Sequence, residues 1–277
     1  MGRLLCIGPI ELSGRGESVG IVVLSLRHEH SLTMSLPLQG QVALVAGAGK
    51  RLGQAVALRL AEEGANVVVH YRSSRAEAQD TVKEIEKIGR RAVAIGANLG
   101  EVVEIKRLFD EAGRHFGRLD ILVNSAANFL RGSMVSTTEE IWDAALGTNL
   151  RAPFFCAQAA APLLRRTQGT IINFADTGGL LGWTGYIPHS VSKAGVVMLT
   201  KVLAKALAPE VRVNAIAPGT ITMEGDPTEW ENDFIKLAPL RRTGKPADIT
   251  ESVVFLAQSK FITGQVLVVD GGRSLSQ

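Results

Sequence analysis

The sequence predicts an α/β fold, in which a single doubly wound domain holds a parallel sheet of about seven strands with helices on both faces. Short apolar runs rich in Val, Ile and Ala alternate with amphipathic stretches from Gln41 onward. The runs are apolar throughout rather than at every second residue, which is typical of parallel strands buried on both faces. The helical stretches between them supply the right-handed crossovers that parallel strands need.

Each run and each stretch gives one expected element in chain order. The strands are expected at residues 42–45, 66–71, 92–95, 121–123, 170–174, 212–216 and 265–269. The helices are expected at residues 51–63, 75–88, 101–116, 138–163, 189–209 and 246–257. No second core and no linker rich in Pro, Gly and Ser divides this pattern, so residues 39–277 are expected to form one domain.

Residues 1–38 carry no sustained helical or alternating pattern. We expect them to be an N-terminal extension that is disordered or that is an artefact of the start site, with Met34 as the alternative start. An added edge segment is a second interpretation. A targeting peptide is a third, and it is disfavoured because no small-residue cleavage site follows the apolar run at residues 19–24.

The charge balance and the cysteines exclude several classes of protein. Thirty Lys and Arg against 27 Asp and Glu give a net charge of +3 without any long block of like charges, so we expect no nucleic-acid partner. No stretch carries the roughly 18 consecutive apolar residues of a membrane span, so no membrane partner is expected. Cys6 and Cys156 stand outside any CxxC or His-rich cluster, which predicts no disulfide framework, no metal site and a reducing, cytoplasmic setting.

A glycine-rich run, GAGKRLG, extends from Gly47 to Gly53 between the first expected strand and the first expected helix. Glycines at this point allow a tight turn whose backbone approaches a pyrophosphate, and the helix N-terminus presents free N–H groups to it. The run therefore predicts a Rossmann-type dinucleotide site that includes Gly47, Lys50, Arg51 and Leu52. A glycine-rich turn that binds nothing is the alternative.

The end of the second expected strand predicts which dinucleotide is bound. It carries, in order, His70, Tyr71, Arg72, Ser73 and Ser74, where an NAD-binding chain places an acidic residue against the ribose 2′-hydroxyl. A guanidinium and two hydroxyls can instead bind a 2′-phosphate, so the sequence predicts NADP(H) as the cofactor rather than NAD(H). The alternative is that Arg72 belongs to a solvated loop face.

Further motifs follow in a fixed order: Asn124-Ser125-Ala126-Ala127, Asn149, Ser190 to Gly195, Pro218-Gly219 and Asp270-Gly271-Gly272. With the glycine turn, they make residues 39–275 resemble the short-chain dehydrogenase/reductase family. Within the family, Gly49 to Gly53, His70-Tyr71 followed by Ser74, and Phe129 resemble the pteridine reductase branch. The resemblance implies a cofactor site that also includes Asn98, Leu99, Asn124, Ser125, Ala126, Lys193, Pro218, Gly219, Thr220 and Ile221.

The resemblance also implies the chemistry, in which a hydride passes between nicotinamide and substrate while a tyrosine four residues before a lysine exchanges the proton. Lys193 is that lysine, but His189 stands at the tyrosine position. Asp176 stands thirteen residues earlier, where most members carry a hydroxyl and pteridine reductases an aspartate. The implied catalytic set is Asn149, Asp176, His189 and Lys193, with Asn149 anchoring a water that links Lys193 to solvent.

The missing tyrosine leaves the proton donor open. We rank His189 assisted by Asp176 first, Asp176 alone second and Tyr186 third. Lys193 and an oxidised nicotinamide disfavour an imidazolium beside them, so His189 needs the anionic Asp176 to stay charged. A chain that binds NADP(H) without turnover is the rival interpretation.

The segment from Thr220 to Leu240 lies outside the strand pattern, and its position in the family makes it a substrate lid. The expected substrate contacts are Phe129, Asp176, Tyr186 and Trp230, with Phe234 as a further apolar contact. These residues predict an NADPH-dependent reductase that acts on a C=N or C=O bond of a small cyclic substrate, such as a pteridine-like ring. An alcohol or ketone oxidoreductase is the alternative, and a homotetramer is expected by resemblance alone.

Overall fold

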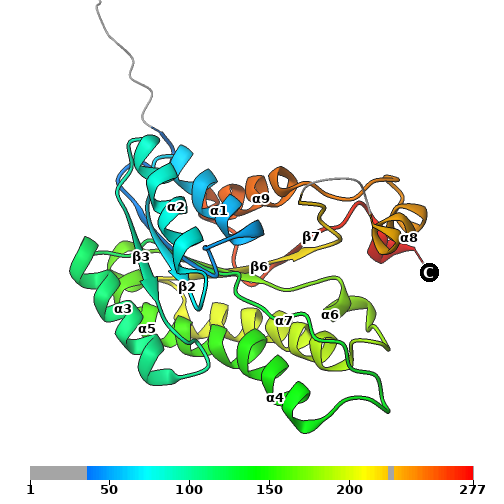
Figure 1. Ribbon diagram of the computed structural model, residues 1–277. Helices are drawn as coiled ribbons and strands as arrows, with labels where there is room; N and C mark the ends of the chain where they lie inside the picture. The colour runs from blue at the N-terminus through cyan, green and yellow to red at the C-terminus, as the bar shows by residue number, and fades with distance from the viewer. Residues whose placement is uncertain (1–35, 224–227, 277) are drawn as a thin grey trace, which may run out of the picture. The chain divides into compact units, whose positions relative to one another are not determined.

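The computed structural model describes residues 36–223 and 228–276, which form one α/β unit around a parallel sheet (Figure 1). The seven strands lie in the order β3-β2-β1-β4-β5-β6-β7, as a doubly wound fold requires. This confirms the predicted fold class. The strands are β1 Val42–Ala46, β2 Asn66–Tyr71, β3 Ala92–Gly96, β4 Ile121–Asn124, β5 Thr170–Phe174, β6 Arg212–Pro218 and β7 Val266–Val269.

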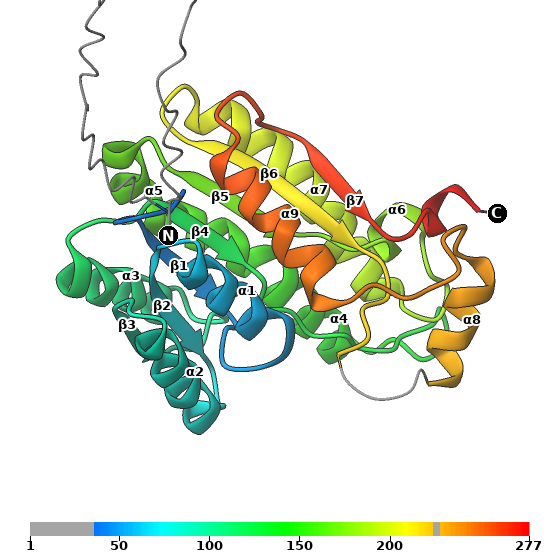
Figure 2. The ribbon, with the colours of Figure 1, turned by 90° about the horizontal axis from the view of Figure 1, so that it is seen from above.

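Helices cover both faces of the sheet, with α1, α2 and α9 on one face and α3, α4, α5 and α7 on the other (Figures 1 and 2). Successive side chains of a strand point to opposite faces of the sheet. Leu44 of β1 packs with α3 and α5, whereas the next residue, Val45, packs with α1 and α9. The helices are α1 Arg51–Glu62, α2 Arg75–Lys87, α3 Val102–Phe116, α4 Glu139–Leu146, α5 Ala152–Thr167, α6 Gly178–Leu181, α7 Ile187–Leu207, α8 Glu229–Leu237 and α9 Pro246–Gln258.

Local sequence explains where several helices begin and end. Pro188 stands in the first turn of α7, where its missing N–H costs no hydrogen bond. Gly117 ends α3 in the left-handed conformation, with φ of 70°. Thr228 and Glu231 form a reciprocal capping box at the start of α8.

The expected helix over 138–163 is interrupted in the structure. A turn of π-helix, η1 Gly147–Arg151, separates α4 from α5. The insertion of one residue into the helical repeat turns Asn149 inward, where its side chain is buried. Helices α6 and α8 were not predicted, because each is short and lies in a stretch interpreted as a loop between the expected elements.

The packed chain begins before residue 39. Leu38 is 1% exposed, and its N–H donates to the Glu63 carbonyl at 2.8 Å. The predicted extension falls mainly on residues 1–35, which lie outside the described residues. No helix in the described ranges is long and apolar enough to cross a membrane.

Candidate active site

The glycine turn follows β1 and leaves no room for side chains. Gly47 has φ of 76°, and a Cβ there would lie 2.9 Å from the Cα of Ala126. A Cβ on Gly53 would lie 2.8 Å from the Gly47 carbonyl carbon. Both positions therefore require glycine, and the turn packs directly against the chain that leaves β4.

Helix α1 begins at this turn with free backbone donors. Its N-cap residue, Lys50, accepts no hydrogen bond from the first turn through its side chain. The first N–H groups of α1, at Arg51 and Leu52, therefore carry partial positive charge that no capping side chain neutralises, which fits the predicted pyrophosphate site. The Ser125 hydroxyl donates to the Ala46 carbonyl at 2.7 Å, and its predicted contact with the cofactor stays a prediction.

The residues after β2 surround the expected 2′-phosphate position. Arg72 and Ser73 are exposed, and Arg72 makes no hydrogen bond or ion pair with the described part of the chain. The Ser74 hydroxyl lies beside Gly49, where it would be 2.5 Å from an added Cβ. Tyr71 points elsewhere, because its ring covers Gly96 on the neighbouring strand β3.

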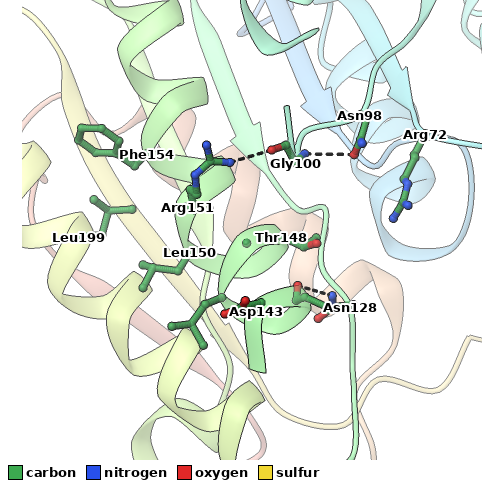
Figure 3. Close-up of a pocket in the computed structure, with 13 residues that line it drawn as sticks. Arg72, Asn98, Gly100, Asn128, Asp143, Thr148, Leu150, Arg151, Phe154 and Leu199 are labelled. Carbon is green, nitrogen blue, oxygen red and sulfur yellow. Dashed lines mark hydrogen bonds between the residues drawn. The ribbon is translucent and has the colours of Figure 1, made fainter. Parts of the chain in front are cut away.

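A cavity of about 830 Å³ lies beside these residues (Figure 3). Arg72 and Asn98 line one side of it, and Arg151, Phe154 and Leu199 line the other. The Asn98 side-chain oxygen accepts from the Gly100 N–H at 3.1 Å, so its amide N–H₂ remains for a ligand. Leu99 is buried at the loop that follows β3.

His70 and Asn124, both predicted cofactor residues, are buried and engaged within the protein. Both ring nitrogens of His70 contact backbone groups at 3.0 Å, namely the Gly47 N–H and the Ala97 carbonyl. The Asn124 amide donates to the Asn173 side-chain oxygen at 2.9 Å, which joins β4 to β5. These two side chains join the segments that surround the predicted cofactor site.

Lys193 lies at the centre of the site, on α7. Its Nζ donates to the Phe174 carbonyl at 2.7 Å. Burial lowers the pKa of Lys193 to about 8, and the negative charge of Asp176 opposes that shift. The ammonium therefore carries its charge at neutral pH, and Nζ lies at the carboxyl end of β5. The predicted contact of Lys193 with the cofactor ribose stays a prediction.

Asn149 ties η1 to two neighbouring segments. Its side chain accepts from the Asn128 N–H at 2.9 Å and donates to the Asn128 carbonyl at 3.1 Å and to the Ser192 hydroxyl at 3.1 Å. All of these contacts are internal to the protein, so the amide fixes the loop after β4 against α7. The predicted role as anchor of a water beside Lys193 stays a prediction.

His189 and Asp176 come together as the sequence predicts. The His189 Nε2 lies 3.7 Å from the Asp176 Oδ2, and the His189 Nδ1 lies 3.4 Å from the Asn128 carbonyl oxygen. A carbonyl only accepts, so this contact places a proton on Nδ1. The neutral ring then turns a bare Nε2 toward a carboxylate oxygen, and one added proton converts this pair of acceptors into an attractive contact.

An aromatic cluster surrounds this pair, and we define it as Phe129, Trp183, Tyr186, His189 and Trp230. Phe129 stands in the middle: it stacks on Tyr186 with centroids 4.5 Å apart and meets His189 edge-on at 4.7 Å. Trp183 lies parallel to His189 at 6.3 Å, and Trp230 of α8 lies 6.5 Å from Phe129. Sequence reasoning missed Trp183, which stands in a loop with no periodic signal.

Tyr186 is committed to another contact. Its hydroxyl accepts from the Arg131 Nε at 2.9 Å, and the Arg131 guanidinium also lies 5.6 Å from its ring centroid. The hydroxyl therefore points to the outer rim of the cluster. This geometry disfavours Tyr186 as the proton donor and favours a role in the substrate wall.

Comparison with known proteins identifies the family. A family model described as enoyl-(acyl carrier protein) reductase matches residues 47–274. The 3-oxoacyl-acyl-carrier-protein reductase FabG of Staphylococcus aureus is 41% identical over 239 residues, which are 83% of this chain and 96% of that protein. The chain belongs to the short-chain dehydrogenase/reductase family. The predicted family is thereby confirmed, and the chain is an oxidoreductase of that family.

Solved structures of this short-chain dehydrogenase/reductase fold are similar over most of the chain. A blue fluorescent protein from a metagenomic library, in complex with NADPH, gives a TM-score of 0.81 at 32% identity and covers 86% of this chain and 99% of that one. A 7α-hydroxysteroid dehydrogenase complexed with NADH and 7-oxo glycochenodeoxycholic acid gives 0.80 at 29% identity, over 86% of this chain and 96% of that one.

The segment predicted to be a substrate lid is anchored to the sheet at the end of β6. The Gly219 N–H donates to the Val269 carbonyl at 2.9 Å, and the Thr177 N–H donates to the Pro218 carbonyl at 3.2 Å. Thr220 and Ile221 lie against Gly244, which donates its N–H to the Thr220 carbonyl at 2.9 Å and pairs with Ile221 in a β-bridge.

Phe234 is buried, and its ring edge would be 2.9 Å from a Cβ on Gly219. Its ring packs α8 against the end of β6, and its predicted contact with a substrate stays a prediction. In the described part of the predicted lid, Trp230 is the ring that belongs to the aromatic cluster.

Proposed function

We propose that this short-chain dehydrogenase/reductase is an NADPH-dependent reductase of a C=N or C=O bond in a small, flat cyclic substrate, of which a pteridine-like ring is one kind. The observation that carries the proposal is the aromatic cluster around His189, next to Lys193 and Asp176. Phe129 is 49% exposed and offers a ring face at the mouth of this cluster. Stacking on such a face favours a planar ring over a flexible chain.

The residues present fit NADPH. The glycine turn and the open N-terminus of α1 suit a pyrophosphate, because added Cβ atoms at Gly47 and Gly53 would fill the turn. The end of β2 supplies an unpaired Arg72 and the hydroxyls of Ser73 and Ser74, with no carboxylate to repel a 2′-phosphate. When bound, NADPH supplies the hydride.

The protein side of the reaction is the handling of one proton. Asp176 is the member of the pair that solvent reaches, since its side chain is 23% exposed and that of His189 only 3%. We assign two proton roles to this pair. Asp176 transfers the proton to the substrate nitrogen or oxygen, and His189 holds the proton that then replaces it on Asp176. Lys193 binds the cofactor ribose.

A 3-oxoacyl thioester is the second candidate substrate class. The observation in its favour is the 41% identity to the Staphylococcus aureus FabG over nearly the full length of that protein. Such a substrate presents one ketone at the end of a flexible chain, and it would not need the stacking face of Phe129.

The test is NADPH oxidation by the purified full chain against dihydrobiopterin, dihydrofolate, a quinone, a simple ketone and a 3-oxoacyl thioester. We expect the flat rings to be reduced faster than the thioester, and Phe129→Ala to slow only the flat rings. Asp176→Asn should abolish turnover and spare NADPH affinity, whereas Asp110→Asn, at an exposed site on α3, should do neither. Firm NADPH binding without turnover of any substrate would instead favour the rival interpretation, in which the chain binds NADP(H) and catalyses no reaction.

We also propose a homotetramer in a cytoplasmic, reducing setting. The family resemblance supports the assembly, and the buried free thiol of Cys156 is compatible with that setting. Light scattering of the purified chain tests the oligomeric state.

A further inference from the structure

His70 makes three contacts to the loops that frame the cofactor turn. Its Nδ1 accepts from the Gly47 N–H at 3.0 Å, and its Nε2 lies 3.0 Å from the Ala97 carbonyl oxygen. Its own carbonyl accepts from the Ala48 N–H at 2.8 Å. The side chain is 2% exposed, so no water replaces these partners.

We propose that His70 is a positioning residue for the cofactor: its neutral ring holds the turn from Gly47 to Gly53 in the shape that binds the pyrophosphate. This inference rests on the proposed cofactor site at the glycine turn. In this inference His70 acts through the glycine turn and does not itself contact the cofactor.

The contacts define one tautomer. The Ala97 carbonyl only accepts, so Nε2 carries the hydrogen, and the Gly47 N–H only donates, so Nδ1 is bare. A second proton, on Nδ1, would point at the Gly47 N–H across 3.0 Å. Two donors cannot share that position, so either the ring or the turn must move.

The turn has little freedom to absorb such a movement. Gly47 packs against Ala126 on one side, and the Gly47 carbonyl packs against Gly53 in the first turn of α1. A shift of the Gly47 amide therefore moves the start of α1, where the free N–H groups lie.

The surroundings keep the ring neutral. The groups that contact it are the backbone amides of the glycine turn and the backbone carbonyl of the loop after β3, and no charged side chain of the described residues acts on it. Burial lowers the pKa of His70 to about 4, against a smaller opposing effect of the Ala97 hydrogen bond.

Three substitutions separate the positioning role from simple packing. His70→Gln supplies an amide oxygen and an N–H₂ at nearly the reach of the imidazole, His70→Asn is too short to span both contacts, and His70→Leu fills the space without polar groups. His115→Leu, at an exposed site on α3, is the matched control.

The experiment is a calorimetric titration of the full chain with NADP⁺ from pH 8 to pH 4.5, with melting curves to confirm folding. We expect His70→Leu and His70→Asn to raise Kd at least tenfold, His70→Gln to stay within about threefold and His115→Leu to match the wild type. At pH 4.5 the wild-type Kd should rise by no more than about 1.3-fold relative to that of His70→Gln, because the pKa of the imidazole is lowered to about 4 and most rings are still neutral there.

Three results would overturn the inference, and they can be told apart. If the folded Asn or Leu variant binds NADP⁺ as the wild type does, His70 has no positioning role and the cofactor site stands. If Gln binds no better than Leu, the hydrogen bonds are not what the turn requires. If the wild type itself binds no NADP⁺, the proposed function fails together with the inference.

Discussion

Gly53 offers a direct test of how tightly the glycine turn is packed. In Gly53→Ala the new methyl group would overlap the Gly47 carbonyl oxygen and would lie 2.8 Å from the carbonyl carbon, whereas carbon atoms pack best about 3.5–4.0 Å apart. One of the two segments must therefore retreat by more than roughly 0.7 Å, and overpacking of this kind costs about 1–3 kcal/mol or more. At this chain length the melting temperature should fall by roughly 2–12 °C.

The matched control is Gly113→Ala, in the interior of α3. A Cβ there meets only Leu163, at an ordinary contact distance of 3.8 Å, and the backbone is already helical. Alanine in place of a helical glycine should stabilise the protein by about 0.5–1 kcal/mol. Calorimetry should show a lower melting temperature for Gly53→Ala and a higher one for Gly113→Ala. The titration with NADP⁺ should show weaker binding for Gly53→Ala alone. A Gly53→Ala variant that melts and binds like the wild type would refute the packing described for this turn.

Three other predictions concern charge. Arg72→Ala should weaken NADPH at least tenfold and leave NADH nearly unchanged, since only NADPH carries the 2′-phosphate; equal losses in fluorescence titrations would remove Arg72 from that role. The rate of NADPH oxidation should fall as the pH rises through about 8, because Lys193, whose pKa is lowered to about 8 by burial, then loses its charge; a rate that stays level to pH 9.5 would contradict this. The folded-state pKa of His70 is lowered from 6.5 to about 4, so its neutral form stabilises the fold fully above pH 6.5, and this contribution is lost as the pH falls through about 4. The loss is on the order of 3 kcal/mol, and urea midpoints from pH 7 to pH 4.5 should fall further for the wild type than for His70→Gln.

Much of the fold could be predicted from the sequence because a parallel sheet leaves a simple pattern. Each strand is a short apolar run, so β2 and β5 begin and end at the predicted residues. The interruption at η1 could not be predicted, because one extra residue in a helix changes the face of Asn149 without breaking the apolar pattern on either side.

The site could be predicted in part, and the limits have physical causes. Lys193, His189 and Asp176 are brought together by β5 and α7, whose positions follow from the motif spacing. Asn128 could not be found, because its backbone atoms make the contacts to Asn149 and His189 and any residue type carries those atoms. His70 was predicted as a ligand because a strand end is normally open, whereas here the loop after β3 covers it.

The aromatic cluster gives the protein an optical reporter of its own. Two of the three tryptophans, Trp183 and Trp230, belong to the cluster, and the third, Trp142, lies on α4. Indole emission overlaps the absorption band of reduced nicotinamide, so excitation energy can pass from these two rings to NADPH bound beside Lys193. Occupancy of the site should therefore be readable as a loss of tryptophan emission and a gain of nicotinamide emission in unlabelled protein.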